Sequence, residues 1–157
     1  PDEIASVLEL TLDGAPAAVE FANRPDAKNL ITLGAESCEI ETEFEQRAKK
    51  ENALGHVYVT RWTRDKDVPY WKLEAPKAGR YQVEASYSAR KADTPFTVEI
   101  GGAKLEGKTT ATGGDWVFKS FPLGVVNVKA GASEVRVRLQ TREGTMNLEK
   151  LVLRPVL

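Results

Sequence analysis

Short segments in which apolar and polar side chains alternate recur through most of this sequence. The clearest is Tyr81–Ser88, where aromatic or aliphatic residues occupy every second position and Gln, Glu or Ser stand between them. A period of two residues is typical of a β-strand that buries one face. Pairs such as Gly101-Gly102 and Gly113-Gly114 supply turn signals between the segments. Many short strands separated by such turns predict an all-β fold, either a sandwich or a barrel.

The stretches Glu41–Leu54 and Asn23–Asn29 depart from this alternation. Glu41–Leu54 is rich in Glu, Lys, Gln and Ala, which favour helices, but its few apolar positions define no strong face. A short helix and an ordered loop are both open there. Nearer the N-terminus, Val7–Leu12 predicts a half-buried strand and the polar stretch Asn23–Asn29 a connector. The other predicted strands are Glu36–Ile40, His56–Thr60, Tyr70–Glu74, Tyr81–Ser88, Phe96–Ile100, Trp116–Phe121, Val125–Val128, Glu134–Gln140 and Met146–Leu153.

The charge balance argues against several classes of partner. The chain has 22 Lys and Arg against 23 Asp and Glu, with a formal net charge of -1. Because the charges are interspersed, we expect no nucleic-acid partner and no binding to an anionic membrane. No run approaches the roughly 20 apolar residues of a membrane span. The first residues lack a signal-peptide pattern, so we expect a segment of a longer polypeptide whose signal is absent or already removed.

The residue types that commonly carry catalysis are sparse. His56 is the single histidine, Cys38 is the single cysteine, and no G-x-S-x-G motif occurs. One cysteine allows neither an intrachain disulfide nor a zinc site of paired Cys and His. Cys38 shares one face of a predicted strand with Ile40, which favours a buried thiol over a nucleophile. Acidic residues are plentiful, but no motif pairs two of them across a cleft, so we expect no enzymatic activity.

An ordered series of motifs resembles one group of sandwiches. Tyr70–Tyr87 reads YWKLEAPKAGRYQVEASY, and FTVEIGG, TGGDW, an LG-containing hairpin and MNLEKLVL follow in that order. This order resembles the galactose-binding-like, jelly-roll sandwiches of carbohydrate-binding modules. It is most similar to the accessory domain behind the catalytic barrel of bacterial α-L-fucosidases. The resemblance implies an antiparallel β-sandwich over residues 28–157, with residues 1–27 a strand segment or linker from a preceding domain.

The same resemblance implies a function. Such a module is non-catalytic, belongs to a larger bacterial glycoside hydrolase that is secreted or periplasmic, and binds glycan weakly. Its partners are then the glycan and the attached catalytic domain, and binding raises the local substrate concentration. Because loops rather than the scaffold determine binding, an alternative stays open. The chain can instead be a structural accessory domain that packs on the catalytic domain without binding sugar.

Sugar binding requires an aromatic ring to stack on a pyranose and polar groups to bond its hydroxyls. Trp116 follows Gly113-Gly114-Asp115, so it either stacks on sugar, with Asp115 beside it, or caps the core. Trp62 stands in the polar loop RWTRDKD, where stacking and packing are both open. Asn147 resembles an asparagine that contacts ligand in some related modules. Its alternative role is a hydrogen bond to the backbone.

A metal site follows from the resemblance alone. Glu36 and Glu149 match acidic positions near the opening and closing strands of calcium-containing relatives. Ca²⁺ takes about six to eight oxygen ligands, commonly carboxylates and carbonyls. Aspartate is usual where Glu149 stands, and no EF-hand spacing occurs. The resemblance predicts a structural Ca²⁺ at these residues, and the alternative is two exposed glutamates.

Overall fold

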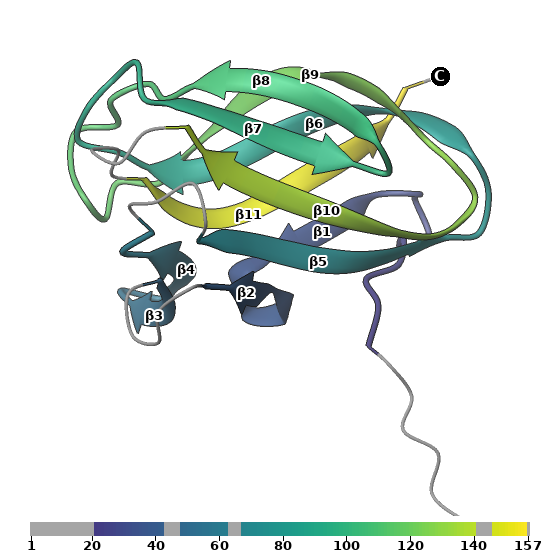
Figure 1. Ribbon diagram of the computed structural model, residues 1–157, viewed down its shortest axis with the longest axis horizontal. Helices are drawn as coiled ribbons and strands as arrows, with labels where there is room; N and C mark the ends of the chain where they lie inside the picture. Colours follow the sequence, from purple (N-terminus) through teal and green to yellow (C-terminus); the bar gives the residue numbers. More distant parts are fainter. Residues whose placement is uncertain (1–20, 43–47, 63–66, 141–145, 157) are drawn as a thin grey trace, which may run out of the picture.

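The computed structural model describes residues 21–42, 48–62, 67–140 and 146–156. They form two antiparallel sheets, shown in Figure 1. One sheet has the order β2 (Glu39–Glu41), β5 (Val68–Ala75), β10 (Gly131–Leu139), β7 (Pro95–Ile100), β8 (Ala103–Lys108). The other has the order β3 (Lys49–Ala53), β4 (His56–Thr60), β11 (Asn147–Pro155), β6 (Gly79–Ser88), β9 (Lys119–Val128), and β1 (Ile31–Gly34) also pairs with β11. The predicted antiparallel β-sandwich is confirmed.

The core lies between the two sheets, because each long strand turns its apolar positions inward. Along β6, Tyr81, Val83, Ala85 and Tyr87 are all buried. On β10 of the facing sheet, the buried residues are Val135, Val137 and Leu139. All seven belong to one hydrophobic cluster. The alternation visible in the sequence therefore identified the inner faces of both sheets correctly.

The segment for which a helix or a loop was open contains a strand. Lys49–Ala53 forms β3, which pairs with β4 and lies at the edge of its sheet. Its residues are exposed or half-buried, because an edge strand beyond the core has no face to bury. The two-residue turn to β4 holds Leu54 and Gly55 at φ of 54° and 81°. This is the backbone of a tight hairpin turn, which Asn-Gly or Asp-Gly usually announces.

Three further strand predictions need correction. Trp116–Phe121 and Val125–Val128 belong to one strand, β9, which begins only at Lys119. Because β9 is an edge strand, Pro122 interrupts no ladder on its outer side. Glu36–Ile40 begins as a 3-10 helix, η1 (Ala35–Ser37), before β2 starts. No strand was predicted at β8, whose residues alternate between half-buried and exposed at a sheet edge.

The predicted connector touches the sandwich. Asn23 forms an isolated bridge with Leu73 of β5, and its backbone N–H donates to the Lys72 carbonyl at 2.8 Å. Beside it, Arg24 forms an ion pair with Glu74 at 2.5 Å. The predicted strand Val7–Leu12 lies outside the described residues, and the division at residues 27 and 28 stays a prediction.

Candidate functional site

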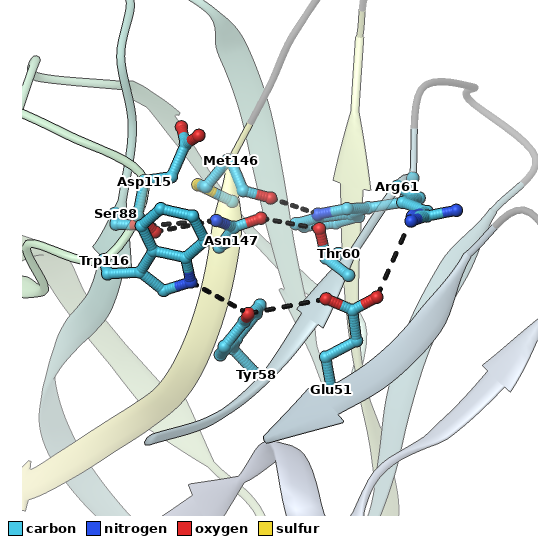
Figure 2. A pocket seen from close by; sticks show the side chains of 10 residues that line it. Glu51, Tyr58, Thr60, Arg61, Ser88, Asp115, Trp116, Met146 and Asn147 are labelled. Atoms are coloured by element: carbon cyan, nitrogen blue, oxygen red, sulfur yellow. Dashed lines mark hydrogen bonds and ion pairs between the residues drawn. The ribbon is translucent and has the colours of Figure 1, made fainter. Parts of the chain in front are cut away.

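A hollow of about 340 Å³ opens at the end of the β4-β11-β6 part of the sheet. β4 contributes Tyr58 and Thr60, β6 ends in Ser88, and β11 begins with Asn147. The loop before β9 closes one side (Figure 2). The lining residues are Glu51, Tyr58, Thr60, Arg61, Trp62, Ser88, Asp115, Trp116, Met146 and Asn147. All four predicted sugar-binding residues therefore line the same hollow. They are Trp116, Asp115, Asn147 and Trp62, of which Trp62 is buried.

Trp116 is an exposed ring held at the mouth of the hollow. The residue is 52% exposed, so it does not cap the core. Its indole Nε1 donates to the Tyr58 hydroxyl at 3.2 Å, which fixes the edge of the ring against β4. Gly113, at φ of 105°, supplies the turn before this loop, a conformation that other residues rarely adopt. A large ring that is both exposed and fixed in orientation is the kind of group on which a planar ligand can stack.

Asn147 joins three parts of the site through hydrogen bonds. Its Nδ2 donates to the Asp115 carbonyl at 2.9 Å and to Ser88 Oγ at 3.3 Å. Its Oδ1 accepts from Thr60 Oγ1 at 2.7 Å. The predicted bond to the backbone is thus present, and the same side chain also lines the hollow. These bonds fix the orientation of the amide, so the polar wall is ordered without ligand.

Trp62 occupies the core side of the site. Its residue exposure is 1%, and its Nε1 donates to the Met146 carbonyl. The ring packs in the main hydrophobic cluster, so the packing alternative holds for this tryptophan. Its position in a charged stretch suggested exposure, but the indole folds under the start of β11. Trp62 supports the floor of the hollow and presents no open face for stacking.

Both acidic residues of the site have cationic partners. Glu51 contacts Lys49 at 2.7 Å and Arg61 at 3.8 Å. The hydrogen bond from Lys49 is the main cause that lowers the pKa of Glu51. Asp115 forms a two-point pair with Arg90 at 2.5 and 2.6 Å, and this pair raises the pKa of the guanidinium. Each carboxylate of the site is consequently compensated by at least one cation.

Glu149, one of the two residues predicted for calcium, has both carboxylate oxygens bonded within the protein. Glu149 Oε1 lies 2.6 Å from His56 Nδ1, and its Oε2 accepts from Ser86 Oγ at 2.7 Å. Burial alone would raise the pKa of Glu149, but the bonds from His56, Ser86 and Lys150 outweigh it and lower the pKa. Glu36 lies in η1, and no group of three His, Cys, Asp or Glu suited to a metal occurs within the described ranges. Ca²⁺ also takes carbonyl oxygens, and the calcium site at Glu36 and Glu149 stays a prediction.

The groups with catalytic potential are also accounted for. The Glu149 carboxylate stands between Ser86 and His56, so the imidazole is not bonded to the hydroxyl that a nucleophilic mechanism would activate. Cys38 is buried, as predicted, and burial raises the pKa of its thiol to about 11. No helix in the part of the chain that the structure describes is long and apolar enough to cross a membrane.

Comparison with known proteins defines the class of fold. No protein-family model and no curated protein sequence matches the chain. Solved structures do match, and several of them are carbohydrate-binding modules. A family 35 carbohydrate-binding module from Clostridium thermocellum aligns with a TM-score of 0.67 at 20% identity, over 79% of this chain and 96% of that one.

Two enzymes contain a similar region. The Podospora anserina GH26-CBM35 β-(1,4)-mannanase aligns with a TM-score of 0.66 at 21% identity over 82% of this chain. The exo-β-1,3-galactanase of Phanerochaete chrysosporium, solved with β-1,3-galactotriose, gives 0.64 at 14% identity over 78%. This chain spans 28% of each enzyme. At these identities the likeness shows a shared fold, and the α-L-fucosidase resemblance stays a prediction.

Proposed function

We propose that this chain is a non-catalytic carbohydrate-binding module whose glycan occupies the hollow beside Trp116. The observation that carries the proposal is the fixed and half-exposed indole at the mouth of a polar hollow. The apolar C–H face of a pyranose stacks on such a ring, because both surfaces lose contact with water. A concave site with one apolar surface and a few oriented polar groups is the usual form of a small-ligand site.

The polar wall supports binding of sugar hydroxyls. Asn147, Thr60 and Ser88 already form an ordered network that uses all of their side-chain donors and leaves acceptor lone pairs on the amide oxygen and the two hydroxyls, to which sugar hydroxyls can donate. Water satisfies sugar hydroxyls almost as well, so each such bond adds only about 0.5–1.5 kcal/mol. Because Glu51 and Asp115 are each paired with a cation, neither presents an uncompensated charge to the ligand, and we expect a neutral sugar. The binding is therefore expected to be weak for a single site.

The module belongs, in this proposal, to a longer secreted or periplasmic glycoside hydrolase. The likeness to regions of two polysaccharide-cleaving enzymes supports this context. The order of the sequence motifs supports an α-L-fucosidase as the parent enzyme. The glycan-binding chain then keeps the catalytic domain close to its substrate, an effect of local concentration that needs no new contact between the domains.

Isothermal titration calorimetry tests the proposal. Fucose-bearing glycans, β-1,4-manno-oligosaccharides and β-1,3-galacto-oligosaccharides form the panel, and each is titrated into the chain and into Trp116→Ala. We expect at least one glycan to bind the parent chain, and we expect the variant to lose that binding while its melting temperature is nearly unchanged. Phe21→Ala is the matched control, because Phe21 is 68% exposed and lies on the β5 side of the molecule, away from the hollow.

The outcomes separate the two functions. Equal glycan affinity in the parent chain and in Trp116→Ala would show that the glycan does not bind in the hollow beside Trp116. A chain that binds no glycan of the panel would instead favour the structural accessory domain that packs on its catalytic partner. Turnover of an aryl glycoside that scales with protein concentration after repurification would contradict the non-catalytic assignment.

A further inference from the structure

A second aromatic surface adjoins the hollow along β4. The Phe118 ring lies 5.4 Å from the Tyr58 ring, centroid to centroid, and 4.5 Å from the His56 ring. The planes of Phe118 and His56 are 22° apart, which makes them a stacked pair. Tyr58 in turn accepts the hydrogen bond from Trp116. The four rings therefore form one continuous row from the hollow to the start of β4.

Three rings of this row reach the surface, with Phe118 half-buried among them, whereas Tyr58 does not. Trp116 is 52% exposed at one end, and the His56 side chain is 37% exposed at the other. Tyr58, in the middle, is only 3% exposed, because Trp116 and Phe118 cover it from the loop before β9. Since His56, Tyr58 and Thr60 alternate along β4, they share the outer face of the sheet. The row lies on that face and leads away from the hollow.

Polar side chains lie beside the His56 end of the row. His56 Nδ1 is bonded to Glu149, which leaves Nε2 without a hydrogen-bond partner among the residues that the structure describes. Ser86 on β6 and Lys150 on β11 both contact the same carboxylate, at 2.7 and 3.4 Å. A flat ring pair flanked by donors and acceptors repeats the combination found beside Trp116.

We propose that Phe118 and His56 form a second sugar subsite, and that the ligand is an oligosaccharide spanning this subsite and the Trp116 hollow. The proposal rests on the proposed function. Because Tyr58 contacts both Trp116 and Phe118, the two ring surfaces lie on either side of the same side chain and are close neighbours. One sugar ring can occupy the hollow, whereas two or more linked rings can also contact the Phe118–His56 pair.

A purely structural role for Phe118 makes a different prediction. If the ring only anchors the loop that carries Trp116, its loss disturbs the hollow and weakens all ligands by the same factor. If the ring contacts a second sugar, its loss lowers the affinity for longer ligands more than that for shorter ones. The informative quantity is therefore the ratio of the monosaccharide Kd to the trisaccharide Kd within each variant.

Calorimetric titrations of a monosaccharide, disaccharide and trisaccharide from the best-binding series of the panel measure this ratio. We expect it to be about tenfold or more in the parent chain, the gain that one additional stacked ring provides. Phe118→Leu keeps an apolar cover over Tyr58 but has no flat face, and the ratio should fall to about threefold or less. Phe118→Tyr restores a flat ring and should restore the ratio. Melting curves of each variant confirm that it is folded.

Three results would contradict the second subsite. Equal Kd values for monosaccharide and trisaccharide in the parent chain would overturn the second subsite and leave the hollow intact. An unchanged ratio in Phe118→Leu, with all affinities lowered together, would overturn it in favour of loop anchoring. Absence of binding to every glycan would refute the proposed function itself, and the second subsite with it.

Discussion

Replacing Trp62 by alanine should destabilise the fold far more than the same change at Trp116. Trp62 is 1% exposed and packs in the main core cluster, whereas Trp116 is 52% exposed. Deleting a buried indole costs about 3–5 kcal/mol, because the transfer free energy is lost and a cavity remains. For a chain of this size, 1 kcal/mol shifts the melting temperature by about 2–4 °C, so Trp62→Ala should lower it by roughly 6–20 °C. Trp116→Ala should lower it by only a few degrees at most.

Trp62→Phe separates the ring from its hydrogen bond. Phenylalanine fills most of the space but cannot donate to the Met146 carbonyl, which the indole now satisfies. A lost hydrogen bond to a buried group costs about 1–3 kcal/mol, so this variant should melt between the parent chain and Trp62→Ala. Circular dichroism melts together with urea unfolding give the free energy of unfolding for each protein.

Two outcomes would contradict the burial of Trp62 and the exposure of Trp116. If Trp62→Ala melts at the same temperature as the parent chain, the ring is not packed in the core as described. If Trp116→Ala instead shows the large loss of stability, the assignment of the exposed and the buried tryptophan is reversed, and the hollow loses its stacking surface.

Three other properties can be checked directly. Burial raises the pKa of Cys38 to about 11, so iodoacetamide at about pH 8 should alkylate the native chain slowly and the denatured chain completely. Mass spectrometry measures the labelled fraction. Fast labelling of the native chain would refute the burial of Cys38. The pKa of Glu149 is lowered in the folded state, so its contribution to stability is complete above the usual glutamate value of 4.5 and declines as the pH falls through the lowered value. The difference in unfolding free energy between the parent chain and Glu149→Gln should accordingly shrink in acid, and a difference that grows would contradict the sign. If a structural Ca²⁺ binds at Glu36 and Glu149 in the native state alone, the melting temperature should be higher in calcium than in chelator, and coinciding melting curves would remove the ion.

Local patterns in the sequence were sufficient for the main strands and their inner faces. β6 and β10 alternate strictly, because one face of each strand packs against the opposite sheet. The edge strands β3 and β8 were missed, since neither has a fully buried face. The start of β9 was misplaced because a local pattern cannot show where the chain leaves a loop and joins a ladder.

The site residues were found by type, but their roles depended on contacts between distant segments. The sequence pointed to Trp116, Asp115 and Asn147, and the structure joins them through bonds between residues far apart, such as Trp116 to Tyr58 and Asn147 to Thr60. Neither Tyr58 nor Phe118 was predicted, because an aromatic residue in a strand is most often part of the core.

Sequence alone determined that this chain folds from alternating strands into a sandwich or a barrel, because the alternation that defines a strand with one buried face is a property of neighbouring residues, and the order of the motifs selected the sandwich. It could not decide which tryptophan would be buried. That depended on tertiary structure: the start of β11 covers Trp62 and accepts its N–H, while the loop before β9 carries Trp116 onto the outer face of β4. Burial is a property of the segments that meet in space, and those segments are separated here by 84 residues for Trp62 and by 58 for Trp116.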